Sequence, residues 1–332
     1  MNMSRSRSIT YDKGLFHLRT EHSSYMFRVT PQGQLEHLHY GAPVRELTRR
    51  RSRSSGRCPT RLGALYRRRG GLLPRRAAHG VVGRGPGDYR PSPIELVTDA
   101  GSWTADFEYA GHTITPGATQ TKCGLPTAYG GDMTLAVLLR DEAAGAELRL
   151  YYTTYPAEDV ITRRAELVCT GAGLSIRKLM SLSLDLAERE LKMTTFTGGW
   201  IREAHRCERA VEGTLVNESR TGFSSSRANP GFILSEREAN EEHGRVWGFN
   251  LVYSGSHMSC VSADERGSAR VMCGISPDRF DWRLEQGESF ETPEAVMCFS
   301  AEGLGGMSRA MHDFVNRHIV RGPGPGGAGP SS

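Results

Sequence analysis

Residues 244–255 read GRVWGFNLVYSG. The large apolar side chains among them, Trp247, Phe249, Leu251 and Tyr253, recur at every second position. A period of two places side chains on one face of a β-strand. The run ends in a serine–glycine pair, which is typical of a turn. The sequence therefore predicts a strand with one apolar, buried face.

The pattern continues to residue 300. Phe280, Trp282 and Leu284 alternate before a break at Gln286-Gly287, and the apolar run 295–299 indicates another buried strand. No helical period separates these runs, and the order strand, turn, strand is typical of layered antiparallel sheets. We expect a β-sandwich whose core contains both Trp247 and Trp282.

Most of the remaining chain shows the same alternation. Short strands are expected between residues 9 and 44. Further strands are expected near 94–96 and 103–109, with a turn at 99–101 between them, and at 135–140, 147–154, 160–168, 174–186 and 193–203. The tripeptide Ala143-Ala144-Gly145 joins two of these strands as a hairpin. Residues 218–230 are rich in Ser, Gly and Asn, which is typical of a loop.

One helix is predicted, close to the end of the chain. Apolar residues recur at helical spacing from Leu304 to His318, and Gly322 and Pro323 then act as stops. We interpret the apolar stripe as a packing face. The tail from Gly322 to Ser332 consists almost wholly of Gly, Pro, Ser and Ala, so we expect it to be disordered.

The residues that could bind a metal or a cofactor form no known motif. Seven scattered cysteines without a C-x-x-C pair indicate buried, reduced thiols. His37 and His39 are expected on one side of a strand, a spacing that a metal could use, but no third ligand lies nearby in the sequence. No phosphate loop, nucleophile elbow or HExxH motif is present. We expect neither a metal site nor a cofactor.

The chain also lacks the signals of a membrane or secreted protein. It has no apolar run of transmembrane length, and residues 1–10 alternate Arg and Ser without an apolar segment. The sequence therefore predicts a cytoplasmic protein without a membrane partner. From these residues alone, we expect a large β-sandwich that binds a ligand or serves as a scaffold.

The segment from Thr48 to Gly87 differs from the rest. It holds twelve Arg and no Lys, Asp or Glu, in an order that fits neither a strand nor a helix. Because the whole chain carries +5, the remainder carries −7, and we expect no nucleic-acid partner for the folded part. Three interpretations stay open: a nucleic-acid-binding arm, a disordered insertion, or the product of a shifted reading frame, which the composition favours.

A succession of motifs is more specific than any single one. In order, they are DVITR (159–163), SLSLDL (181–186), GWIRE (199–203), ESRTGFSS (218–225), WGFNLVYSG (247–255), GESFETPE (287–294) and GMS (306–308). FHL (16–18), HYG (39–41) and GDYR (87–90) belong to the same pattern. Over residues 9–46 and 87–321, the chain resembles the N-terminal domain of glycoside hydrolase family 36, the α-galactosidases of raffinose and melibiose utilisation.

The resemblance implies a mainly β fold, a large antiparallel β-supersandwich with one C-terminal helix and no (β/α)₈ barrel in this chain. Five segments follow from it: first strands of the sandwich (1–47), the Arg-rich insertion (48–86), the rest of the sandwich (87–302), the helix (303–321) and the tail (322–332). In the family, a barrel with two catalytic aspartates follows and hydrolyses terminal α-galactosides without a metal.

Neither catalytic aspartate has a counterpart here, so no catalytic residue is assigned. The candidates for substrate binding are Asp88 and Arg90 of the GDYR motif. In tetrameric members, an aromatic and acidic loop in place of the Arg-rich segment reaches a neighbouring subunit's active site, and those contacts are lost here. A homo-oligomer stays open as a partner. We expect the non-catalytic domain of an α-galactosidase, truncated before its barrel. The alternatives are a stand-alone carbohydrate-binding or scaffolding module, and a nucleic-acid binder.

Overall fold

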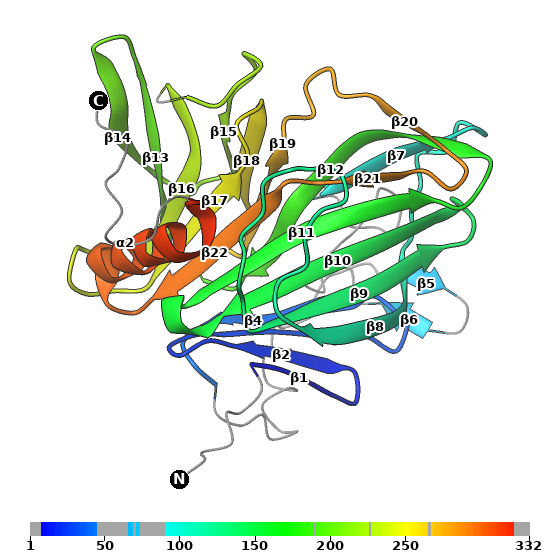
Figure 1. Ribbon diagram of the computed structural model, residues 1–332, viewed down its shortest axis with the longest axis horizontal. Coiled ribbons are helices and arrows are strands. Elements are labelled where there is room, and N and C mark those ends of the chain that lie inside the picture. Colours follow the sequence, from blue (N-terminus) through cyan, green and yellow to red (C-terminus); the bar gives the residue numbers. More distant parts are fainter. Residues whose placement is uncertain are drawn as a thin grey trace.

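Antiparallel sheets make up most of the structure, as the alternating runs predict (Figure 1). The computed structural model describes residues 8–44, 66–68, 71–73, 90–188, 190–225, 227–264 and 267–321. The Arg-rich segment lies outside these residues, except for the paired strands β5 (Tyr66–Arg68) and β6 (Gly71–Leu73), and so does the tail. The described residues form no (β/α)₈ barrel.

The largest sheet has ten strands. Its order is β14 (Arg202–Ala210), β13 (Leu191–Gly199), β16 (Ala228–Glu236), β17 (Val246–Val252), β22 (Glu294–Ser300), β11 (Val160–Cys169), β10 (Ala146–Tyr155), β9 (Met133–Asp141) and β8 (Glu108–Pro116), with β21 (Ser289–Glu291) also paired to β11. The predicted hairpin is confirmed, because β9 and β10 pair across a turn that includes Gly145.

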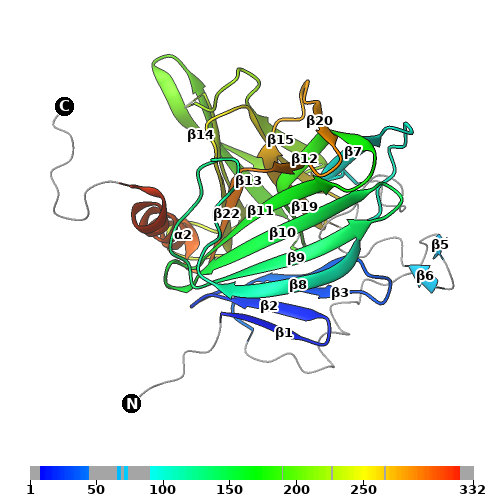
Figure 2. The same cartoon turned by 45° about the vertical axis from the view of Figure 1, so that its right-hand side comes forward.

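Two smaller sheets pack against the inner face of the ten-stranded sheet (Figure 2). One has six strands, β15 (Thr214–Glu218), β18 (His257–Ala263), β19 (Ala269–Ile275), β12 (Gly173–Leu186) and β20 (Trp282–Glu285), with β7 (Ile94–Thr98) beside β12. The other has four, β1 (Ile9–Asp12), β2 (Leu15–Arg19), β3 (Ser24–Val29) and β4 (Leu35–Gly41). The fold is therefore the predicted layered β-structure.

The core lies between these sheets and contains the residues that the alternation selected. Trp247, Phe249 and Leu251 of β17 are buried, and the indole N–H of Trp247 donates a hydrogen bond to the Tyr40 carbonyl at 3.1 Å. Burial of a tryptophan is favourable when its N–H finds an acceptor. The prediction for Trp247 is confirmed, and this contact ties β4 to the ten-stranded sheet.

The prediction that Trp282 is a core residue is wrong. Its side chain is 50% exposed and packs against Phe290, with ring centroids 5.2 Å apart. Trp282 is the first residue of β20, an edge strand of the six-stranded sheet. Only Leu284, further along β20, reaches the buried layer. At this end of the strand, Phe290 of β21 covers only part of the ring, and half of the side chain stays exposed.

The expectation that His37 and His39 share a face is also wrong. A β-bulge shifts the register between β3 and β4, so His37 lies opposite Phe27 and His39 opposite its neighbour Met26. Neighbouring residues of a strand point to opposite faces. His37 is buried, while His39 hydrogen-bonds the Ala42 carbonyl at 2.9 Å.

The single predicted helix is confirmed. Helix α2 (Gly303–Phe314) continues into a π-helical turn, η2 (Val315–Ile319), and buries Leu304, Met307 and Phe314 against the outer face of β17 and β22. No side chain caps its N-terminus. Instead, the amides of Leu304 and Gly305 donate to the carbonyls of Asn240 and Glu241 at 2.8 and 2.9 Å. These bonds satisfy amides that a helix leaves free at its start.

The run predicted over 193–203 divides into β13 and β14, because a tight turn at Trp200-Ile201 reverses the chain. The strand expected near 103–109 begins only at Glu108. The six described cysteines are free, and four of them, Cys169, Cys260, Cys273 and Cys298, are buried. In the part of the chain that the structure describes, no helix is long and apolar enough to cross a membrane.

Candidate functional site

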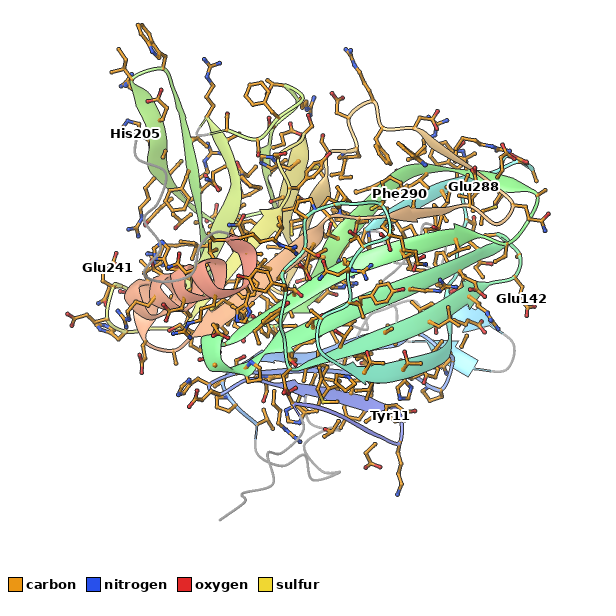
Figure 3. The ribbon with its side chains drawn as sticks, viewed as in Figure 1. Tyr11, Glu142, His205, Glu241, Glu288 and Phe290 are labelled. Carbon is orange, nitrogen blue, oxygen red and sulfur yellow. The ribbon has the colours of Figure 1, made fainter. Side chains whose placement is uncertain are left out.

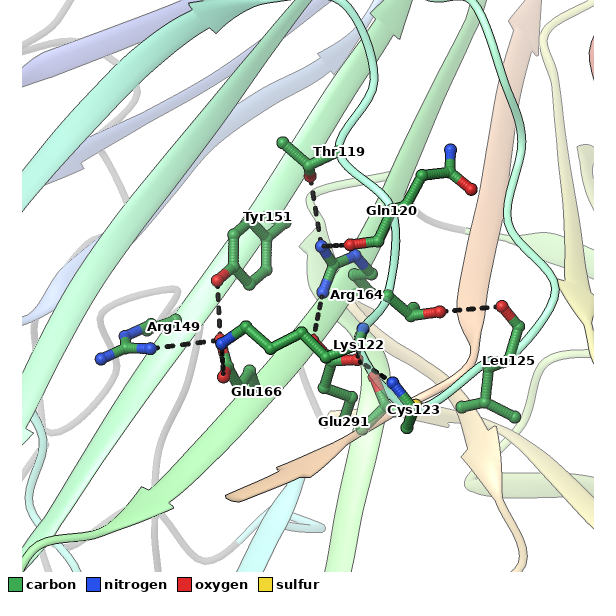
Figure 4. A network of polar contacts seen from close by, with 12 residues as sticks. Thr119, Gln120, Lys122, Cys123, Leu125, Arg149, Tyr151, Arg164, Glu166 and Glu291 are labelled. Atoms are coloured by element: carbon green, nitrogen blue, oxygen red, sulfur yellow. Dashed lines mark hydrogen bonds and ion pairs between the residues drawn. The ribbon is translucent and has the colours of Figure 1, made fainter. Parts of the chain in front are cut away.

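The outer face of the ten-stranded sheet carries a cluster of charged side chains. Along β10 and β11, Leu148, Leu150, Ala165 and Leu167 face the core, so the residues between them face outward. Residues 117–132, which we call the strap, connect β8 to β9 and cross this face (Figure 4). The strap and the sheet together enclose a polar network that includes three buried carboxylates, Glu166, Glu291 and Glu294.

Glu166 is the first of these anchors. Its carboxylate accepts hydrogen bonds from the Tyr151 hydroxyl at 2.7 Å, the Lys122 ammonium at 2.9 Å and the Arg149 guanidinium at 3.4 Å. Burial alone would raise the pKa of Glu166, but the hydrogen bonds from Lys122 and Tyr151 and the nearby positive charges lower it overall. The group is therefore an ionised carboxylate that holds the side chain of a strap residue.

Glu291 and Arg164 form the second anchor, a buried ion pair with a separation of 3.3 Å. The Glu291 carboxylate also accepts the backbone amides of Lys122 and Cys123 at 2.7 and 3.3 Å. Arg164 donates to the Thr119 hydroxyl at 3.2 Å and lies over the Tyr151 ring, 3.9 Å from its centroid. The pair thus fixes the strap backbone through both of its charges.

Glu294 holds the far part of the strap. It accepts the Ala128 amide at 2.6 Å, and burial raises the pKa of its carboxyl group. Next to it, the Tyr129 amide donates to the His318 carbonyl at 3.0 Å, and the His318 ring bonds the Tyr129 carbonyl at 2.9 Å. The strap is therefore joined to the end of η2, so the outer face of the sheet, the strap and the helix form one connected unit.

This arrangement supports structure rather than acid–base chemistry. Each buried carboxylate among the described residues has a hydrogen-bonded partner: Asp141, Glu158, Glu166, Asp185, Glu291 and Glu294. A general acid or base needs an open side that a substrate can reach. In the described ranges, no three His, Cys, Asp or Glu side chains are grouped so as to hold a metal ion.

Of the two predicted substrate-binding residues, Asp88 lies outside the described residues. Arg90 lies in a different place from the polar network, where its guanidinium is 2.9 Å from a carboxylate oxygen of Asp185. Asp185 is buried in β12 and receives two further hydrogen bonds from Arg270, at 2.8 and 3.0 Å. The structure thus gives Arg90 an ion-pairing partner, and its role in substrate binding stays a prediction.

The chain matches the family model for the glycosyl hydrolase family 36 N-terminal domain over residues 33–285. It belongs to this family. Among curated relatives, the α-galactosidase AgaA of Geobacillus stearothermophilus is 34% identical over 92% of the chain, and a probable α-galactosidase C of Aspergillus terreus is 33% identical over 96%. This chain spans 43% of the length of the first relative and 42% of the length of the second.

Solved family 36 structures agree with the fold. The α-galactosidase AgaB of Geobacillus stearothermophilus superposes with a TM-score of 0.86 at 32% identity, covering 95% of this chain and 44% of that one. A variant of AgaA in complex with raffinose gives 0.86 at 33% identity, covering 93% and 44%. The resemblance inferred from the ordered motifs is confirmed, and the chain corresponds to the N-terminal part of these enzymes.

Sequence reasoning missed the polar network. Its signal is present in β10 and β11, where Arg149, Tyr151, Arg164 and Glu166 occupy the alternate positions between apolar residues. Such a pattern normally indicates a solvated outer face. Lys122 and Gln120 of the strap bond Glu166 and Arg164, each 44 positions further along the chain. Nothing in the order of residues indicates that this loop covers the strands.

Proposed function

We propose that this chain is the non-catalytic N-terminal domain of an α-galactosidase, an enzyme of carbohydrate metabolism that hydrolyses terminal α-D-galactosides. The observation that carries the proposal is the match at a TM-score of 0.86 to 44% of the solved AgaB chain. In this proposal, the α-galactoside binds only when the catalytic part is present. A cytoplasmic location is part of the proposal, and the four buried, unpaired cysteines support it.

The polar network gives this domain a physical role. It locks the strap to the sheet, and the bonds between Tyr129 and His318 lock the strap to η2. A catalytic barrel works only when its residues are held in position to within a fraction of an ångström. We propose that the outer face serves as a rigid base for the catalytic part that makes up the remaining length of the relatives.

Two measurements test the proposal. The purified chain is assayed with a chromogenic α-galactoside, and we expect no turnover above the buffer blank. A hybrid is then made in which residues 1–321 replace the matched N-terminal part of the Geobacillus AgaA enzyme, and we expect it to hydrolyse the same substrate. Turnover by the chain alone that galactose inhibits would contradict the non-catalytic role. A hybrid that folds but stays inactive would contradict the supporting role.

A second function, a stand-alone carbohydrate-binding module, has one observation in its favour. Three tryptophans have large exposed areas, with Trp103 at 44%, Trp200 at 81% and Trp282 at 50%. Sugars stack on exposed aromatic rings, which are also common at protein interfaces. Titration of the chain with galactose, melibiose and raffinose discriminates the two functions. Millimolar or tighter binding that is lost on replacing one of these tryptophans would favour the module.

The residue-level proposal concerns Arg90. Its place in the GDYR motif supports a contact with substrate, while its ion pair with Asp185 supports a structural role. In an active hybrid, Arg90→Lys should raise KM with little change in the unfolding midpoint if the contact with substrate is real. A lower midpoint with unchanged KM would assign Arg90 to the ion pair alone.

A further inference from the structure

A two-stranded arm projects from one end of the ten-stranded sheet (Figures 1 and 2). The arm consists of β13, the turn at Trp200-Ile201 and β14, residues 191–210. β14 is the last strand of its sheet, and eight of its nine residues are exposed. Most of the outer strand therefore contributes little to the core, and its stability has to come from pairing with β13.

The tip of the arm presents two apolar side chains to solvent. Trp200 and Ile201 are 81% and 76% exposed, more than any other large apolar residue in the described part of the chain. Neither side chain contributes to the core of this domain. An exposed pair of this size at the end of a projecting hairpin is typical of a contact with another polypeptide surface.

The backbone at the tip is strained. Ile201 has a φ of 67°, in the left-handed region that β-branched residues rarely adopt. The turn is also tight, because a Cβ on Gly198 would lie 1.8 Å from the Arg202 carbonyl oxygen. The Ile201 amide donates to the Glu203 carboxylate at 3.1 Å, which helps to hold this conformation. Strain that a fold maintains at an exposed position indicates a functional constraint.

The edge of the arm, by contrast, is protected against pairing with another strand. Charged residues of both signs line β14, among them Arg206 and Glu208, which form an ion pair at 2.5 Å. The register with β13 shifts near Thr197, and Ala204 has a φ of 53°. Charges and bulges on an edge strand oppose strand addition. The arm is therefore suited to contact a partner through its tip.

The arm is anchored next to the start of helix α2. Arg206 lies 3.4 Å from a carboxylate oxygen of Glu241, and the Glu241 carbonyl accepts the Gly305 amide. Figure 3 shows His205 on the arm and Glu241 in the turn beside the helix. Since this chain matches the N-terminal part of its relatives, more than half of their length follows α2. The chain leaves this domain after η2, at the other end of the same helical segment, where His318 contacts the strap. The catalytic part of such an enzyme thus follows a helix whose first turn lies beside the arm.

We propose that Trp200 and Ile201 insert into an apolar pocket on the catalytic part of the α-galactosidase. The inference rests on the proposed function and adds a specific contact to it. The pocket has to accept an indole and a branched aliphatic side chain. The contact does not require any change in the rest of this domain, because the strained turn already holds both side chains outward.

The hybrid with the Geobacillus AgaA catalytic part tests this contact. The fluorescence of Trp200 is obtained as the difference between the unmodified protein and its Trp200→Phe variant. Quenching of this fluorescence by acrylamide is measured in the chain alone and in the hybrid. We expect Trp200 to be freely quenched in the chain and several-fold less in the hybrid. Trp200→Ser should lower the unfolding midpoint of the hybrid by about 4 °C or more and leave that of the chain unchanged. The matched control is Trp282→Ser, which replaces a half-exposed tryptophan on an edge strand of the six-stranded sheet.

The outcomes separate this proposal from the broader one. If Trp200 stays equally quenchable in an active hybrid, the docking contact is refuted and the proposed function stands. If the hybrid folds without activity, the proposed function is refuted, and the quenching of Trp200 still decides whether the tip docks. If the chain alone forms a dimer that Trp200→Ser dissociates, the tip belongs to a contact between two copies, and our assignment is wrong.

Discussion

The ion pair between Arg164 and Glu291 is the contact on which the attachment of the strap most depends. Replacement Glu291→Ala removes the partner of a buried guanidinium and the oxygen that accepts two strap amides, those of Lys122 and Cys123. The two side chains of the pair are only 4% and 3% exposed, so water cannot replace the lost carboxylate without a structural change. We therefore expect both a loss of stability and a release of the strap.

The magnitude follows from the surroundings of Arg164. Removing one partner of a buried ion pair costs about 3–5 kcal/mol. Arg164 keeps its stacking over the Tyr151 ring, which lies on the sheet and not on the strap, and this favours the lower end of the range. We expect Glu291→Ala to reduce the free energy of unfolding by about 3 kcal/mol. In Glu291→Gln an amide oxygen still accepts the strap amides, so we expect a loss of about 1–2 kcal/mol.

Urea denaturation measures these losses, and an unchanged m-value would show that the unfolded state is not affected. Limited trypsinolysis reports on the strap, because the Lys122 side chain is 70% exposed while its backbone is held by Glu291. Glu291→Ala should accelerate cleavage after Lys122. The double replacement Arg164→Met with Glu291→Leu is the control, and it should cost less than Glu291→Ala because no charge is left buried. A loss below about 1 kcal/mol for Glu291→Ala, or a larger loss for the double variant, would refute the reasoning.

Three further predictions test other parts of the domain. Burial lowers the pKa of His37 to about 4, below its ordinary value of 6.5. The stability that the neutral ring contributes is therefore complete above pH 6.5 and is lost as the pH falls towards 4. His37→Phe should flatten the dependence of the unfolding free energy on pH in this window, and an unchanged curve would count against this prediction. A Cβ on Gly248 would lie 2.5 Å from the Met307 sulfur. Gly248→Val should therefore displace α2 and lower the free energy of unfolding by about 2 kcal/mol. In a double-mutant cycle, the same replacement should cost less in the Met307→Ala background. In thiol labelling with Ellman's reagent, Cys123 should react fastest among the six described cysteines, so Cys123→Ser should remove its phase. Cys298, whose thiol pKa is raised by burial, should react only on unfolding, and a fast phase from Cys298 would contradict its burial.

Much of the architecture followed from periodicity and from ordered motifs. The alternation at Trp247, Phe249 and Leu251 identified β17, and the helical spacing from Leu304 to Phe314 identified α2, because both patterns express the geometry of a single element. The ordered motifs identify the family without any knowledge of the tertiary structure. These are local properties of the chain, and a single sequence contains them in full.

The contacts between distant segments were decided by tertiary structure alone. Glu291 accepts a hydrogen bond from the backbone amide of Lys122, 169 positions away in the sequence. No local pattern indicates which loop covers the outward-facing side of a strand. Trp282 alternates as a core residue does, yet it is half exposed because β20 is an edge strand. The histidine pair was separated by a bulge that depends on the neighbouring strand. Periodicity fixes which side of an element a residue faces, whereas burial depends on what the rest of the chain places against that side.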